Sequence, residues 1–139
     1  MKIIHKGDML FQAQIGHHTV TADVSVHFGG NDRAVTPPEY FIFSLGSCCG
    51  AMLAGWCYDN DLDPDELSVE VDYEKGPKGI TDIKVTIDLP GVNVHEKWKE
   101  IAQVVHTCPV HKSLYQIRDC DVKLAIRRKG DITCHKKDK

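Results

Sequence analysis

The sequence predicts an α+β protein in which an antiparallel sheet wraps around one long, buried central helix. Three observations carry this prediction. The run from Tyr40 to Tyr58 holds no charged residue, two pairs of alternating segments are each joined by turn residues, and two stretches with helical spacing follow each other near the end. The predicted order is β-β-α-β-β-α-α-β. Hairpins and grouped helices, in place of alternating β-α units, favour antiparallel pairing.

The strands are predicted by alternation of apolar and polar side chains. Leu10–Ile15 and Thr19–Phe28 form a first hairpin across a turn that holds one glycine and two histidines. Leu67–Glu74 and Ile80–Leu89 form a second hairpin across a turn that holds glycine and proline. Cys120–Arg128 is expected to be the last strand.

The central helix is expected from about Pro38 to about Asn60. Thr36 offers a hydroxyl for the N-cap, prolines need no donor in the first turn, and the carboxylate of Glu39 lies near the positive end of the helix dipole. Apolar side chains cover all sides of this helix, which predicts burial.

Small residues form two stripes along this helix, Gly46-Gly50-Ala54 and Ser47-Ala51-Gly55. Such stripes allow another backbone to approach closely. The neighbour is either the same helix of a second copy, which predicts a homodimer, or the chain's own sheet.

Two helices are expected after the second hairpin. Val94–His106 has apolar residues at helical spacing with charges between them, which predicts an amphipathic helix on the core. A further helix begins after Thr107, with Pro109 at its first position.

Length and charge bound the class of protein. A chain of 139 residues fits a single domain, with residues 129–139 as a basic tail. The formal charge of −3 and the acidic body argue against nucleic acid as a partner. The uncharged run is rich in Gly, Ser and Cys, and no Lys/Arg cluster flanks it, so no membrane span is expected. The beginning of the chain lacks a continuous apolar segment, which predicts a cytoplasmic protein.

Six cysteines are the main carriers of chemistry. Cys57 and Cys120 are interpreted as small hydrophobic residues. Cys108 immediately precedes the helical Pro109, where backbone N–H groups and the helix dipole favour a thiolate and lower the thiol pKa. Cys108 and His111 also form half of a Cys-x-x-His metal site, to which Cys134-His135 could add ligands. A half-site alone is a weak signal, and no cofactor is expected.

Two motifs resemble those of the OsmC/Ohr family, osmotically inducible protein C and organic hydroperoxide resistance protein. The first runs from Thr36-Pro37-Pro38-Glu39 to Ser44-Leu45-Gly46-Ser47-Cys48, and the second is Cys108-Pro109-Val110-His111-Lys112-Ser113-Leu114. The order of the elements also fits, up to about Arg128.

The resemblance implies a homodimer with active sites at the subunit interface. It also implies a thiol-dependent peroxidase that reduces organic hydroperoxides and hydrogen peroxide. In this scheme Cys48 attacks the O–O bond and becomes a sulfenic acid, Cys108 condenses with it to a disulfide, and a cellular dithiol restores both thiols.

Two features depart from the family pattern. The central motif matches the family pattern in two registers. In the preferred register Pro37 and Cys48 are the matching residues. In the other, Pro38 and Cys49 match, and Glu39 is the glutamate that supports the cysteine. Cys48 lies nine positions after Glu39, which places the two on different faces of a helix. The family arginine is also missing, since no arginine precedes Arg33. His17, His18 and Arg33 are the candidate substitutes.

Three hypotheses follow. The first is a cytoplasmic, dimeric thiol peroxidase that acts in oxidative stress defence, with Cys48 as nucleophile and Cys108 as resolving thiol. The second is a non-catalytic OsmC-like protein that binds a small molecule or responds to redox state. The third is a metal-binding module built on Cys108 and His111.

Overall fold

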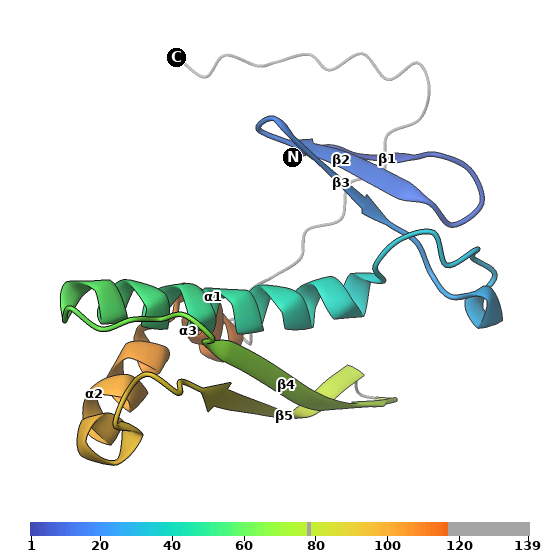
Figure 1. The fold of residues 1–139 in the computed structure, drawn as a ribbon. Coiled ribbons are helices and arrows are strands. Elements are labelled where there is room, and N and C mark those ends of the chain that lie inside the picture. The colour runs from blue at the N-terminus through green and yellow to red at the C-terminus, as the bar shows by residue number, and fades with distance from the viewer. Residues whose placement is uncertain (78, 117–139) are drawn as a thin grey trace, which may run out of the picture.

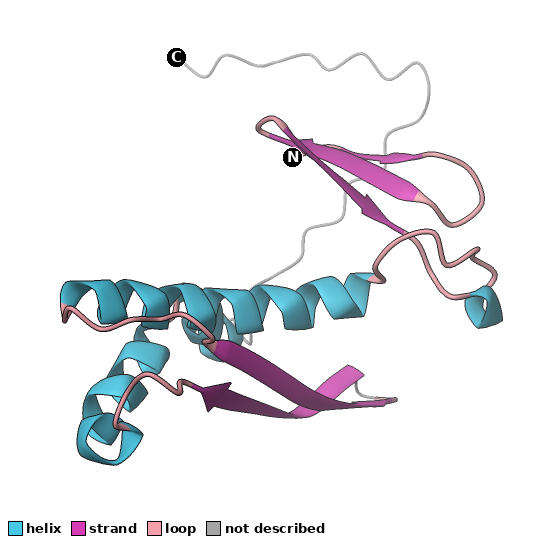
Figure 2. Ribbon diagram, in the orientation of Figure 1, coloured by secondary structure: helices cyan, strands magenta, loops and turns pink. Residues whose placement is uncertain are grey.

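The computed structural model describes residues 1–77 and 79–116. Helix α1 runs through the molecule, with one small sheet above its N-terminal end and a second sheet and two helices against its other side (Figure 1). Both sheets are antiparallel (Figure 2). The predicted α+β class is therefore confirmed. The predicted last strand, Cys120–Arg128, lies outside the described residues.

The first sheet contains one strand that the pattern analysis missed. Its order is β1 (Ile3–His5), β2 (Phe11–Ile15) and β3 (His18–Ala22). β1 pairs with β2 through Ile3 opposite Ala13. Three residues are too few to show a clear alternation, so β1 carries no strong sequence signal.

The prediction of a strand over Thr19–Phe28 is wrong beyond Ala22. The chain turns out of the sheet and forms a short 3-10 helix, η1 (Val26–Phe28). The buried carboxylate of Asp23 causes this turn, because it accepts hydrogen bonds from the backbone N–H groups of Val24 and Arg33 and from Arg33 Nε, at 2.9, 3.2 and 2.9 Å. A hydrogen bond from the Arg33 side chain is the largest cause that lowers the Asp23 pKa, to about 2.

Helix α1 (Pro37–Asp59) begins and ends one residue before the predicted bounds. The carboxylate of Glu39 accepts hydrogen bonds from the backbone N–H and the hydroxyl of Thr36, at 2.8 and 2.7 Å. These bonds complete a capping box at the start of the helix. By length and composition α1 would also qualify as a membrane span, a test that core helices of soluble proteins pass too.

The second sheet packs on one of the two small-residue stripes. It consists of β4 (Ser68–Gly76) and β5 (Gly79–Asp88). A Cβ added at Gly46 would lie 3.0 Å from Val71 Cγ2, on β4. The stripe that contains Gly46 therefore lets the chain's own sheet approach α1, as the second of the two sequence interpretations proposed.

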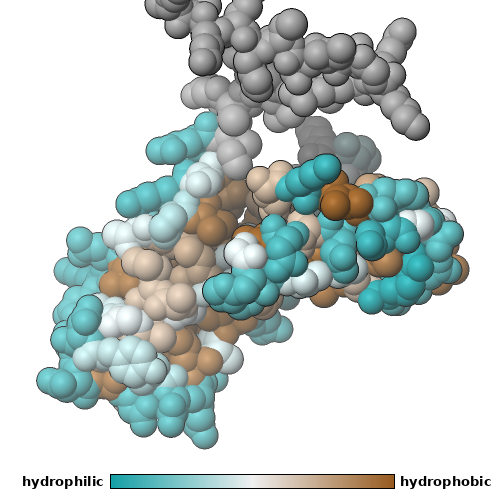
Figure 3. Space-filling view, turned by 90° about the horizontal axis from the view of Figure 1, so that it is seen from above, coloured by the Kyte–Doolittle hydropathy of each residue, from teal (hydrophilic) through white to brown (hydrophobic). Residues whose placement is uncertain are grey.

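The residues that the structure describes leave the other side of α1 uncovered. Its exposed residues are Phe43, Ser47, Ala51, Gly55 and Tyr58, and they include the whole second stripe. Figure 3 shows this upper side of the molecule, where apolar and small residues gather between hydrophilic margins. The expected burial on all sides is thus reached on one side only.

Two helices complete the described part of the fold. Helix α2 (Val94–Thr107) packs against the C-terminal half of α1, and α3 (Pro109–Gln116) follows after a single residue, Cys108. The core around α2 centres on Leu53, which is fully buried. Burial of a leucine side chain contributes about 1.5–3 kcal/mol to stability. The second core cluster, beside α3, is made of Leu45, Cys49 and Cys108.

Candidate active site

Three cysteines from two distant parts of the sequence meet beside α3. Cys48 and Cys49 are consecutive residues of α1, and Cys108 is the residue between α2 and α3. Their thiols are joined by hydrogen bonds, since both Cys48 and Cys49 hydrogen-bond to Cys108. We call these three residues the thiol cluster.

The members of the thiol cluster differ in their access to solvent. Cys108 is 0% exposed and Cys49 is 1% exposed, whereas Cys48 is half-buried. Cys57, the remaining free cysteine among the described residues, lies further along α1 in the other core cluster. A reagent from solvent therefore reaches Cys48 first.

The surroundings of Cys108 favour its thiolate. Burial acts to raise the pKa of this thiol, but hydrogen bonds outweigh it and the net pKa is lowered. The donors are the thiol of Cys48, the backbone N–H groups of His111 and Val110, and the thiol of Cys49. The two N–H groups belong to the first turn of α3, where backbone donors have no partner within the helix.

The other two thiols are the protonated partners of Cys108. The hydrogen bond to Cys108 is the main cause that raises the pKa of Cys48. Burial, followed by the charge of Cys108, raises the pKa of Cys49 to about 12. Among the three thiols of the cluster, Cys108 is therefore the one whose thiolate is favoured, with the thiols of Cys48 and Cys49 as its partners.

A pocket of about 530 Å³ opens onto the thiol cluster between α1, β5 and α3. Cys49 is the member of the cluster that lines it. Apolar side chains form most of the wall, and polar groups of Thr81, Asp82, His111 and Tyr115 also line it. The volume suits a small organic molecule.

The sequence profile of the family described as OsmC-like protein matches residues 29–124, which is more than half of the chain and includes all three cysteines of the cluster. The chain belongs to the OsmC-like family. A comparison with curated protein sequences gives no match.

Solved structures of OsmC-like and stress-response proteins share the fold. A protein from Psychrobacter arcticus described as an osmotic stress induced and detoxification response protein is 22% identical, with a TM-score of 0.71 over 81% of this chain and 85% of that one. An organic hydroperoxide resistance protein OsmC from Legionella pneumophila, also described as a redox protein, is 18% identical, with a TM-score of 0.58 over 86% and 90%. An OsmC-like protein from Vibrio cholerae is 14% identical, with a TM-score of 0.55 over 76% and 78%.

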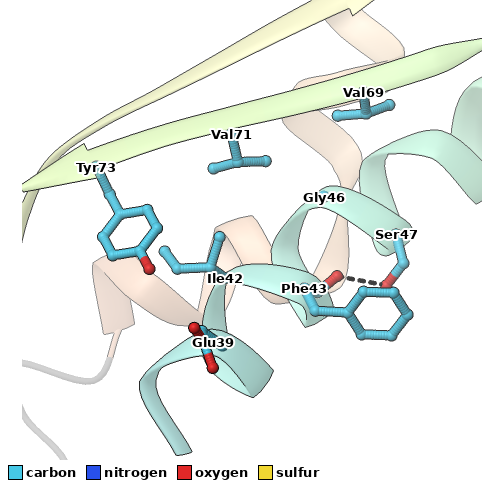
Figure 4. Close-up of a pocket in the computed structure, with 8 residues that line it drawn as sticks. All are labelled: Glu39, Ile42, Phe43, Gly46, Ser47, Val69, Val71 and Tyr73. Atoms are coloured by element: carbon cyan, nitrogen blue, oxygen red, sulfur yellow. Dashed lines mark hydrogen bonds between the residues drawn. The ribbon is translucent and has the colours of Figure 1, made fainter. Parts of the chain in front are cut away.

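Glu39 lies away from the thiol cluster in this OsmC-like chain. It lines a different hollow, between α1 and β4, together with Gly46, Ser47 and Tyr73 (Figure 4). Its carboxylate is hydrogen-bonded to Thr36. Within one chain Glu39 is therefore an N-terminal capping residue, and its support of a cysteine stays a prediction.

The candidate substitutes for the family arginine also lie elsewhere. Arg33 forms ion pairs with Asp23 and Asp8, at 2.9 and 3.3 Å. The rings of His17 and His18 lie against each other in a tilted arrangement at the end of the first hairpin, with centroids 4.6 Å apart. Since the donors to Cys108 come from α1 and α3, thiolate stabilisation within the chain does not depend on these residues.

His111 contributes to the site through its backbone and its position. Its N–H group hydrogen-bonds to Cys108, and its ring stacks between those of His106 and Tyr115, with centroid distances of 5.6 and 5.3 Å. Within residues 1–77 and 79–116, no group of three or more His, Cys, Asp or Glu side chains is arranged to hold a metal ion. Cys134-His135 lies outside the described residues.

Sequence reasoning missed two features of the site, the contact of Cys49 with Cys108 and the pocket that Cys49 lines. The side chains of consecutive helical residues point about 100° apart, so Cys48 and Cys49 can both contact Cys108 when it lies between these two directions. The adjacent cysteines Cys48 and Cys49 were therefore the sequence feature that could have predicted a shared contact with Cys108. They were interpreted instead as two alternative positions for one nucleophile.

Replacement of Cys48 by alanine is predicted to raise the pKa of Cys108. The lowered pKa of Cys108 depends on hydrogen-bond donors, and Cys48→Ala removes the thiol donor with the largest effect. At a given pH the variant then holds less Cys108 thiolate than the wild type. The measurement is the pH titration of the ¹³Cβ chemical shift of Cys108 by NMR.

The matched control for this titration is Cys57→Ala, which removes a thiol from the same helix in the other core cluster and should leave the Cys108 titration unchanged. A midpoint in Cys48→Ala that is equal to or below that of the wild type would contradict the donor role of Cys48.

Proposed function

We propose that this OsmC-like protein is a thiol-dependent peroxidase that reduces organic hydroperoxides and hydrogen peroxide. The observation that carries the proposal is the pairing of a half-buried thiol, Cys48, with a buried thiol of lowered pKa, Cys108. A peroxidatic thiol needs access to substrate and a route to the thiolate, and a nearby second thiol prevents over-oxidation.

The first step is oxidation of Cys48. Its proton passes along the hydrogen bond to the Cys108 thiolate, which leaves Cys48 as the thiolate that faces the substrate. Cys48 attacks the O–O bond of the hydroperoxide, an S–O bond forms and the O–O bond breaks. The products are the Cys48 sulfenic acid and an alkoxide, which takes a proton from water.

The second step forms the disulfide. The sulfur of Cys108 attacks the sulfur of the Cys48 sulfenic acid, and the hydroxyl group leaves as water once it receives the Cys108 proton. One disulfide bond forms for each hydroperoxide reduced. A dithiol then reduces this disulfide, becomes a disulfide itself and returns both cysteines to thiols.

The comparisons support this reaction at the level of the family. The Legionella pneumophila protein with the same fold is described as an organic hydroperoxide resistance protein and a redox protein. Such a description belongs to that protein, and the thiol cluster is the reason to extend it to this chain.

Peroxidase assays on single cysteine variants test the proposal and the register. With tert-butyl hydroperoxide and dithiothreitol, Cys48→Ser is expected to lose turnover to the level of the uncatalysed reaction, because the nucleophile is gone. Cys108→Ser is expected to stop after Cys48 is oxidised, because a second hydroperoxide converts the unresolved Cys48 sulfenic acid to sulfinic acid. Cys49→Ser should still undergo the first oxidation, because Cys48 is retained.

The control for these assays is Cys57→Ala, which should turn over like the wild type. If Cys48→Ser consumes peroxide as fast as the wild type, Cys48 is not the nucleophile. If no variant or wild-type protein turns over with any hydroperoxide, the non-catalytic binding or redox-responsive alternative replaces the peroxidase.

We further propose that the protein acts as a homodimer that covers the exposed side of α1. This side combines the small residues Ser47, Ala51 and Gly55 with Phe43 and Tyr58, which are 67% and 68% exposed. A helix that is apolar on all sides is typical of a fully buried position. A second copy provides that burial without a change in the chain.

A charge on this side of α1 is predicted to separate the dimer. Ala51→Glu places a carboxylate where the copies meet, and burial of an unpaired charge is unfavourable. Light scattering after gel filtration should give twice the chain mass of 15.6 kDa for the wild type and a single-chain mass for Ala51→Glu.

The control for the dimer is Gln103→Glu, which adds a carboxylate on the exposed surface of α2 and should keep the wild-type mass. A single-chain mass for the wild-type protein at all concentrations would contradict the proposed dimer.

A further inference from the structure

We infer that Cys49 is a third redox-active thiol, which takes the disulfide over from Cys48 and exposes it to a small dithiol in the pocket between α1, β5 and α3. This inference rests on the proposed peroxidase. Under this inference the two half-reactions take place on two sides of α1. The hydroperoxide is reduced at Cys48, and the protein disulfide is reduced by the dithiol at Cys49.

The first argument is the shared partner. Cys49 and Cys108 pack in one buried core cluster and Cys48 packs against it, with Cys48 and Cys49 at neighbouring positions that point about 100° apart around the helix. Thiol–disulfide exchange requires the attacking sulfur to contact one sulfur of the existing disulfide. Cys49 contacts Cys108, which would be one half of the Cys48–Cys108 disulfide, before any movement of the backbone.

The second argument is the asymmetry of access. The pocket of about 530 Å³ is lined by Cys49 and by neither Cys48 nor Cys108. A disulfide between Cys48 and Cys108 therefore leaves the pocket lined by a free thiol. A disulfide between Cys49 and Cys108 includes a residue that lines the pocket, and this is the side from which a reductant would approach it.

The exchange step is balanced without another reactant. The sulfur of Cys49 attacks the sulfur of Cys108, the bond between Cys48 and Cys108 breaks, and Cys48 leaves as a thiolate. The proton lost by Cys49 is taken up by Cys48. Part of the rise in the Cys49 pKa comes from the charge of Cys108, and this part disappears when Cys108 is neutral in a disulfide.

The pocket matches a small dithiol in size and lining. Its apolar wall, which includes Leu45 and Ile83, can hold the carbon chain of the reductant, and polar groups of Thr81, Asp82 and Tyr115 can hold polar substituents. One thiol of the reductant attacks the Cys49 sulfur. This attack breaks the bond between Cys49 and Cys108 and releases Cys108, leaving a mixed disulfide of the reductant with Cys49. The second thiol of the reductant then closes a disulfide on the reductant and releases Cys49.

Time-resolved labelling of the wild-type protein tests the exchange. The full chain is oxidised with one equivalent of tert-butyl hydroperoxide, quenched in acid at intervals and labelled with N-ethylmaleimide. Fragmentation of the peptide between Cys48 and Cys49 locates the label. The inference predicts a label on Cys49 at early times and on Cys48 at late times, as the disulfide moves from Cys48 to Cys49.

Steady-state turnover with dithiothreitol gives a second readout. Cys49→Ser should still undergo the first oxidation but lose turnover, while Cys57→Ala keeps both. A label that stays on Cys49 at all times, together with wild-type turnover of Cys49→Ser, would overturn the exchange and leave the peroxidase intact. If no disulfide to Cys108 forms at all, the peroxidase mechanism itself fails.

Discussion

The hydrogen bond between the thiols of Cys48 and Cys108 is the interaction on which the site depends. It joins the middle of α1 to the junction of α2 and α3, across sixty residues of sequence (108 − 48). The packing of Leu45, Cys49 and Cys108 in one core cluster holds the two segments together. Because Cys108 is buried at the start of α3, the same packing also supplies the backbone donors that stabilise its thiolate.

In this arrangement the thiol with the lowered pKa and the thiol that solvent can reach belong to different cysteines. Cys108 holds the more stable thiolate but is fully buried, and Cys48 is accessible but has a raised pKa. In the proposed mechanism a proton passes from Cys48 to Cys108, so that the accessible thiol reacts and the buried thiol takes up its proton. This differs from a site in which an arginine next to the nucleophile supplies the positive charge. The arrangement of Cys48 and Cys108 needs no arginine beside the nucleophile, and Arg33 is already ion-paired with Asp23 and Asp8.

Much of the fold could be predicted from local patterns. The capping box at Thr36 and Glu39 fixed the start of α1 to within one residue, and the Cys108-Pro109 step fixed the start of α3. The same step predicted a lowered pKa for Cys108, and backbone donors of α3 contribute to it, but the larger contribution of the Cys48 thiol depends on tertiary packing. The strand over Thr19–Phe28 was wrong because the turn is set by Asp23, whose partners lie up to ten residues away.

The remaining features of the site depend on tertiary contacts. The two small-residue stripes of α1 have equal patterns, and only the position of Val71 beside Gly46 shows which of them faces β4. The pocket beside Cys49 requires residues of β5 and α3 to come together, and no spacing in the sequence encodes it.

The most direct test of the account is a count of thiols after one oxidation. In a variant with Cys120→Ser and Cys134→Ser, four cysteines remain, Cys48, Cys49, Cys57 and Cys108. One equivalent of hydroperoxide should remove two of the four thiols, and dithiothreitol should restore both, with Cys108 in every disulfide that is mapped. Four thiols that still titrate after oxidation, or a disulfide that involves Cys57, would contradict the thiol cluster as the redox centre.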